Sequence, residues 1–270
     1  MFTKVFHMGW IASLLVIALA VNSAAVFAQN AESVSPETVV ETFYTEYLGF
    51  FHASETEPTF PIEGWYRDST LLTGDMIADL DSFDEPFDPL LCAQNVPTAV
   101  LVDDAELNDA EDAAQVVVRT DFANYHAFTV NLVLQDDLWL IDNVDCSPVA
   151  QTPEGVVSQF YLIYLSHNAW DGEGERPNFL VDGAYQGVLL LSDDYIAEIA
   201  ALLDDANGLS HDPLICAQDV PQSVEVVERV VLDWVAEVTV STSFANHTFT
   251  VALEQSDENW LITGIMCGRD

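Results

Sequence analysis

The chain has 270 residues, with 45 aspartates and glutamates against six lysines and arginines, and its formal net charge is -39. Half of its residues are hydrophobic, so it can bury a core and is not expected to be disordered. A surface this acidic repels nucleic acid and anionic lipid, which excludes nucleic-acid binding as a function. We expect a solvated acidic surface without a cofactor, although loose association of divalent cations stays open.

The first 28 residues have the pattern of a cleaved export signal. Lys4 precedes an apolar run at residues 11–21, and Val26-Phe27-Ala28 ends the segment. Because the run is shorter than the roughly 20 residues that a spanning helix needs, we expect cleavage after Ala28 rather than a membrane anchor. Cleavage would leave no integral membrane segment. The sequence therefore predicts a secreted or periplasmic protein.

An internal repeat organises the rest of the chain. Residues 88–97 read DPLLCAQNVP, and residues 212–221 read DPLICAQDVP. Further blocks match in the same order before and after these segments, including Phe-Ala-Asn, Phe-Thr-Val and Trp-Leu-Ile. Agreement at so many ordered positions predicts two copies of one domain, at residues 29–150 and 151–270.

Within each copy, helical spacing gives way to alternation. Apolar residues recur at helical spacing from residue 40 to 51 and again from 157 to 164. Thr73 and Ser192 are suited to be N-caps of a second helix. Apolar and polar residues then alternate through residues 115–135 and their counterparts in the second copy, as in strands with one buried face. Each copy is therefore predicted to be an α+β domain with helices on one face of an antiparallel sheet.

The order of helices followed by a curved meander resembles the nuclear transport factor two-like, or cystatin-like, superfamily. The repeated Asp-Pro-Leu-x-Cys-Ala-Gln-x-Val-Pro segment resembles an uncharacterised family of exported bacterial domains in that superfamily. The resemblance implies two tandem domains of this fold. The superfamily includes ketosteroid-isomerase-like enzymes, small-ligand binders and protein-interaction modules, so the fold does not by itself select a function.

Each copy also carries two cysteines, and four cysteines permit three pairings. Repeat symmetry favours structural disulfides between Cys92 and Cys146 and between Cys216 and Cys267, which suits an exported protein. The alternative is a metal site, but neither a Cys-x-x-Cys motif nor a cluster of Cys and His residues supports one. We therefore expect no metal centre.

Six residues are candidates for a ligand pocket. They are Tyr44, Tyr47, Tyr161 and Tyr164 on the first helices, and His126 and His247 beside hairpin turns. The tyrosine hydroxyls either line a cavity in a cone-shaped domain or reach a rim while the rings fill the core. The histidines either act as general bases or pack against a strand.

The sequence contains no nucleophile elbow, phosphate loop, dinucleotide fingerprint or EF-hand loop. We therefore expect a non-catalytic module that binds an unknown small ligand or protein. Two alternatives stay open: a ketosteroid-isomerase-like or hydrolase-like enzyme with a polar site in the domain cone, and a structural component of the cell envelope. A deep enclosed pocket would favour the enzyme, whereas an exposed apolar patch would favour protein binding.

Overall fold

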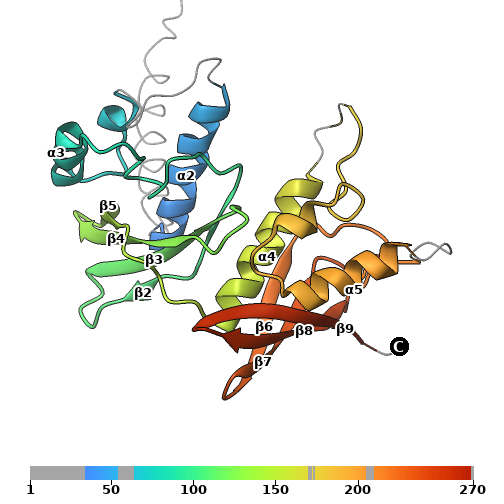
Figure 1. Ribbon diagram of the computed structural model, residues 1–270. Coiled ribbons are helices and arrows are strands. Elements are labelled where there is room, and N and C mark those ends of the chain that lie inside the picture. The colour runs from blue at the N-terminus through green and yellow to red at the C-terminus, as the bar shows by residue number, and fades with distance from the viewer. Residues whose placement is uncertain (1–33, 54–63, 170–171, 173, 205–209, 269–270) are drawn as a thin grey trace, which may run out of the picture.

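The structure, a computed structural model, describes residues 34–53, 64–169, 172, 174–204 and 210–268. The expected export signal lies outside these residues. The described chain is α+β, as predicted, and contains two antiparallel sheets, each with its own hydrophobic cluster (Figure 1). We refer to residues 34–147 as the first half and to residues 152–268 as the second half.

The first half places its helices before its strands. The elements are α2 (Pro36–Ala53), η1 (Trp65–Asp68), α3 (Gly74–Ser82), β1 (Val100–Val102), β2 (Glu106–Leu107), β3 (Ala113–Thr120), β4 (Ala127–Gln135) and β5 (Leu138–Asp145). The strand order is β1-β3-β4-β5, and β2 also pairs with β3. The edge beside β3 is therefore formed by two short strands in succession.

The second half repeats this order with a simpler sheet. The elements are α4 (Pro153–Asn168), η2 (Ala184–Gly187), α5 (Asp193–Asp204), β6 (Val224–Leu232), β7 (Val235–Thr242), β8 (Thr248–Ser256) and β9 (Asn259–Cys267). The strand order is β6-β7-β8-β9. One long strand, β6, takes the edge position that β1 and β2 share in the first half.

Local sequence signals set the helix starts. The Thr73 side chain accepts a hydrogen bond from the Met76 amide, and the Ser192 side chain accepts one from the Tyr195 amide. Both predicted N-caps are therefore confirmed. Thr152 caps α4 in the same way by accepting from Gly155. These caps satisfy amides that have no partner within the helix.

The strands bury the faces that alternation predicted. Val116 and Val118 of β3, and Val238 and Val240 of β7, are fully buried under their helices. A register shift interrupts the β4–β5 pairing and the β8–β9 pairing at matching positions. Such bulges increase strand twist and so help to curve a sheet around a helix. No helix among the described residues is long and apolar enough to cross a membrane.

Helix α4 has neighbours on two sides. It contacts β6, β7 and β9 of its own half and also β1 and β3 of the first half. Gly155 and Gln159 on this helix are both buried. The two halves are thus joined by a helix as well as by the short connection at residues 148–151.

Candidate functional site

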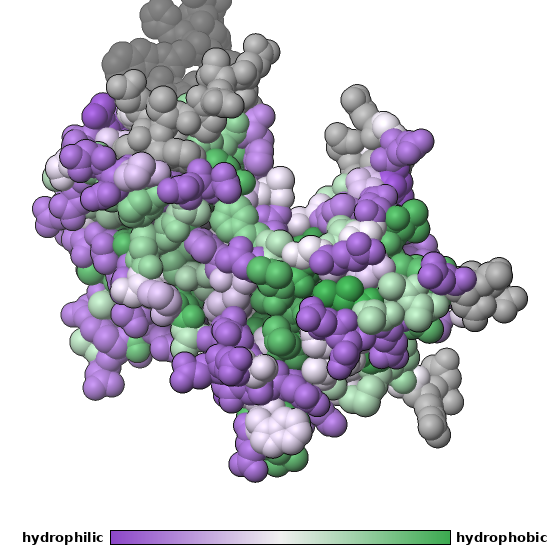
Figure 2. Space-filling view, viewed as in Figure 1, coloured by the Kyte–Doolittle hydropathy of each residue, from purple (hydrophilic) through white to green (hydrophobic). Residues whose placement is uncertain are grey.

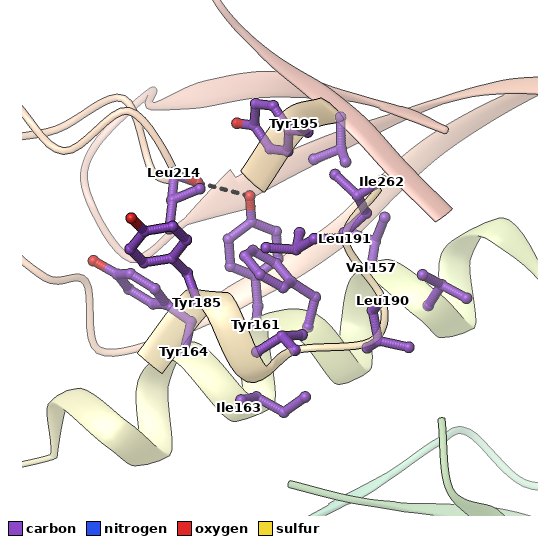
Figure 3. Close-up of a cluster of buried hydrophobic side chains, with 14 of the residues drawn as sticks. Val157, Tyr161, Ile163, Tyr164, Tyr185, Leu190, Leu191, Tyr195, Leu214 and Ile262 are labelled. Atoms are coloured by element: carbon purple, nitrogen blue, oxygen red, sulfur yellow. Dashed lines mark hydrogen bonds between the residues drawn. The ribbon is translucent and has the colours of Figure 1, made fainter. Parts of the chain in front are cut away.

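The candidate tyrosines are buried against a loop that has the same length in both halves, rather than exposed to solvent. Tyr44 donates a hydrogen bond to the Leu90 carbonyl at 2.7 Å, and Tyr161 donates to the Leu214 carbonyl at 2.8 Å. Figure 3 shows Tyr161 pointing from α4 toward Leu214, among apolar side chains of the second half. Both rings join the hydrophobic clusters. Each hydroxyl therefore ties the first helix to the loop that carries the first cysteine.

The second tyrosine of each helix is bonded to a carboxylate. Tyr47 donates to Asp88 at 2.6 Å, and Tyr164 donates to Asp212 at 2.8 Å. Asp88 also accepts from the Leu90 amide at 2.8 Å, as Asp212 does from Leu214. Each aspartate thus holds its own loop in a tight turn.

Burial changes the acidity of these pairs. Burial raises the pKa of Asp88 to about 6, although hydrogen bonds from Tyr47 and from backbone amides act in the opposite direction. Burial likewise raises the pKa of Asp212. The pKa values of Tyr47 and Tyr164 are raised by burial and by the neighbouring carboxylate. The hydroxyls therefore stay protonated and act as donors.

The two histidines make matching contacts. The His126 ring is 3.1 Å from the Thr120 hydroxyl and 3.2 Å from the Cys92 carbonyl. The His247 ring is 3.0 Å from Thr242 and 3.1 Å from the Cys216 carbonyl. Burial lowers the pKa of His126, partly offset by its bond to Cys92. Each ring thus bridges a strand end and a disulfide.

The disulfides join Cys92 to Cys146 and Cys216 to Cys267, the pairing that repeat symmetry favoured. Each one fastens the loop after the second helix to the end of the last strand. Within the described residues, no group of three or more His, Cys, Asp or Glu side chains is placed to hold a metal ion.

Two pockets lie on the surface of the first half. One, of about 310 Å³, lies beside the Cys92–Cys146 disulfide between α3 and β5. Its walls include Phe83, Phe87 and Cys146. The other, of about 390 Å³, is lined by α2 and η1 residues such as Phe50 and Trp65. None of the six candidate residues lines either pocket, so their role in ligand binding stays a prediction.

The structure brings together a polar cluster between the halves that the sequence did not reveal. The Gln159 side chain accepts from the His126 amide at 3.2 Å and donates to the Asn124 carbonyl at 2.7 Å. Nearby, Arg119 bonds to Asp103 and to Tyr125, both at 2.6 Å. The buried groups of this interface therefore satisfy one another, as a stable contact requires.

An exposed apolar surface on the β6–β7 hairpin was also not anticipated. Leu232 and Trp234 at the turn are 66% and 59% exposed, and Val230 and Val231 are exposed beside them. In Figure 2 this end of the molecule shows white and green surface next to purple. The sequence signal was present in the five valines of residues 224–231, where the first half has Asp103, Asp104 and Glu106 at residues 100–107.

The chain was compared with known proteins. No family model matches it, and no curated protein does. One similar solved structure is the type VI native effector–immunity complex Tae3–Tai3 from Ralstonia pickettii, with 20% identity and a TM-score of 0.34 over 44% of this chain and 97% of that chain. Another is an Ntf2-like protein involved in plasmid conjugation, with 13% identity and a TM-score of 0.16 over 63% of this chain and 75% of that chain. These low scores carry no argument about function.

Proposed function

We propose that this protein is an exported, non-catalytic module that binds another protein. The observation that carries the proposal is the exposed apolar tip of the β6–β7 hairpin, formed by Val230, Val231, Leu232 and Trp234. Large apolar side chains exposed together at one hairpin of an otherwise charged protein are typical of an interaction site. Tryptophan is also enriched among residues that contribute most to protein interfaces.

The interior of each half supports a binding role over a catalytic one. The tyrosine hydroxyls that point into the sheet-and-helix core are engaged by Leu90, Asp88, Leu214 and Asp212 of the same chain. Asp88 has a raised pKa, which would suit a general base, but it is fully buried and accepts bonds from backbone amides. A catalytic base must reach the substrate proton, directly or through one water.

We also infer that the protein is exported and consists of two copies of one domain. Matching tyrosine, histidine, aspartate and disulfide contacts in the two halves support two copies of one domain of the nuclear transport factor two-like type. Paired cysteines support passage through an oxidising compartment. The organisation is tested by expressing residues 29–150 and 151–270 separately in an oxidising compartment. Cooperative unfolding of both fragments is expected, and two unstructured fragments would contradict it.

The binding role is tested by capture with matched variants. The mature protein, a Leu232→Ser/Trp234→Ser variant and a Leu138→Ser/Val181→Ser control are immobilised. Leu138 and Val181 are exposed apolar residues away from this hairpin, so the control loses similar surface. Each is incubated with the extracytoplasmic proteins of the host, and a retained protein is purified and titrated against all three by calorimetry.

We expect a partner that binds the wild type and the control with similar affinity and the hairpin variant at least about tenfold more weakly. Burial of apolar surface should also give a negative heat-capacity change on binding. A partner that binds all three proteins equally would show that the hairpin is not the site. Retention of no protein by any of them would contradict the binding role itself.

A further inference from the structure

The outer edge of β6 is a free strand edge, because no other strand in the described part of the chain pairs with it. β6 is the terminal strand in the order β6-β7-β8-β9 and has nine residues. Most of its residues are exposed, although α4 contacts one of its faces. An edge strand of this length presents a row of backbone groups that another strand can pair with.

The turn geometry identifies which backbone groups face outward. Leu232 pairs with Val235 across the two-residue turn Asp233-Trp234, and Asp233 has a positive φ of 53°. In such a hairpin the residues that flank the turn exchange hydrogen bonds, and bonded and non-bonded pairs then alternate along the ladder. The N–H and C=O groups of Val231 and Arg229 therefore point away from β7, toward the free edge.

The equivalent edge of the first half is blocked. It consists of the three-residue β1 and the two-residue β2, separated by Asp103-Asp104-Ala105. Asp103 turns inward to form an ion pair with Arg119, and α4 contacts β1. Short strands and inward charges are devices by which proteins protect sheet edges from pairing, whereas α4 contacts the edge strand of both halves. The β6 edge has one irregularity, the register shift between Val226 and Glu228, and its pairing with β7 is regular from Glu228 to Leu232.

The side chains beside the β6 edge define what a paired strand should carry. Glu228, Val230 and Leu232 share one face of β6, and Glu237 of β7 lies directly opposite Val230. Arg229 on the other face is already paired with Glu154 of α4. A complementary strand would therefore place apolar side chains on the face beside Val230 and Leu232, since such cross-strand pairs are favourable. The residues between them lie on its other face, where basic side chains suit a chain of net charge -39.

We propose that the β6 edge binds an extended segment of a partner protein as a fifth strand, and that this segment alternates apolar with basic side chains. The proposal rests on the protein-binding role and specifies the partner. Charge selects this occupant over a second copy of the chain, because two molecules of net charge -39 repel one another. Backbone pairing would supply affinity, and the alternating side chains would supply selectivity.

The test uses a synthetic nine-residue peptide of alternating valine and lysine, blocked at both ends. A second peptide has the same sequence but carries N-methyl groups on alternate residues. The methyl groups remove the backbone N–H donors along one edge of the peptide without changing its charge. Both peptides are titrated by calorimetry into the mature protein, a Val231→Pro variant and a Val231→Thr variant at about physiological salt, where exposed charges are well screened. Circular dichroism checks that both variants remain folded.

We expect the unmodified peptide to bind the wild type and Val231→Thr with similar affinity. Binding to Val231→Pro, or of the N-methylated peptide to the wild type, should be at least about tenfold weaker. The proline removes an outward amide and leaves the ladder to β7 intact, which is why edge positions tolerate it. Equal binding of both peptides would mean that only charge attracts them, and would overturn strand pairing.

Two other results would also be decisive. Sedimentation that shows a dimer of the wild type, lost in Val231→Pro, would assign the edge to a second copy and overturn the proposed partner. Absence of peptide binding, together with capture of a natural partner that depends on Leu232 and Trp234, would overturn strand pairing while leaving the protein-binding role in place.

Discussion

Helices α2 and α4 begin the two halves with closely similar sequences, yet they have different surroundings. On α2, one side packs on its own sheet, and the other side, which includes Thr38 and Thr42, is exposed. On α4 the matching positions are Gly155 and Gln159, and both are buried against the first half. The tyrosines on the inner sides keep the same partners in both helices. The halves therefore share their inner contacts and differ where α4 meets a second neighbour.

The differences at these two positions have a physical reason. A Cβ atom at residue 155 would lie 2.7 Å from Nη1 of Arg119, so the close approach of α4 requires glycine. Gln159 supplies both a donor and an acceptor to the backbone of the first half, whereas a threonine is shorter. A helix that gains a second neighbour thus changes the residues on its outer side and keeps those on its inner side.

The largest expected effect concerns what the halves share. Replacing Cys92 and Cys146 with alanine, or Cys216 and Cys267, should lower the free energy of unfolding by about 4 kcal/mol in either case in the chain-entropy model. The two losses should be similar because the cysteines are separated by 54 and 51 residues. Urea denaturation of the two double variants measures both. A large loss in only one variant would show that the halves depend on their disulfides differently.

A second effect concerns the buried aspartates. Burial raises the pKa of Asp88 from 3.8 to about 6, so the folded state binds a proton more tightly than the unfolded state. Its contribution to stability is therefore full below pH 3.8 and is lost as pH rises to about 6. Asp88→Asn should remove this dependence, so the variant should gain up to about 3 kcal/mol relative to the wild type between pH 4 and 7.

This dependence is measured as the difference between two urea-denaturation series, because the other acidic residues contribute equally to both proteins. The matching Asp212→Asn variant should change in the same direction, since burial also raises the pKa of Asp212. A difference that stays constant from pH 4 to 7 would show that Asp88 keeps an ordinary pKa in the folded protein.

A third effect should distinguish the two helices. Gln159→Leu would leave the His126 amide and the Asn124 carbonyl without their partner at a partly buried site, which should cost about 2 kcal/mol of stability. The control is Thr42→Leu at the matching exposed position of α2, where a change within about 0.5 kcal/mol is expected. Thermal or urea unfolding compares the two. Similar losses would contradict the different surroundings of the helices.

The smallest expected effect concerns Gly155. Alanine there improves helix propensity, but its Cβ would displace the Arg119 side chain from Asp103 and Tyr125, so a net loss of about 1 kcal/mol is expected. Thr38→Ala on α2 should instead be neutral or slightly stabilising. A double-mutant cycle with Arg119→Ala should recover the loss. Additive effects in that cycle would show that the two residues do not interact.

Much of each half could be predicted because its signals are local. Helical spacing located α2 and α4, alternation located β3, β4 and β7, and Thr73 and Ser192 marked helix starts. Trp260 is buried, whereas its counterpart Trp139 is only half-buried. The cysteine pairing within each half was also predicted, because repeat symmetry favoured it among the three possible pairings.

The contacts of the candidate site were less predictable because they depend on long-range packing. The sequence shows that Gly155 and Gln159 stand where the first half has Thr38 and Thr42. It does not show which helix packs against which sheet. Likewise, the valines of β6 resemble those of a buried strand, and only the sheet order places them at an edge. The tyrosines were expected either to line a cavity or to fill the core, and their partners Leu90 and Leu214 lie far along the chain.

The most direct test of a free β6 edge is amide hydrogen exchange of the mature protein with and without the valine–lysine peptide. In the free protein, the amides of Arg229 and Val231 should exchange quickly, whereas those of Glu228 and Val230, which face β7, should be protected. Saturating peptide should slow exchange at Arg229 and Val231 and leave β1 of the first half unchanged. Protection at Arg229 and Val231 before peptide is added, or no change after it, would contradict a free pairing edge.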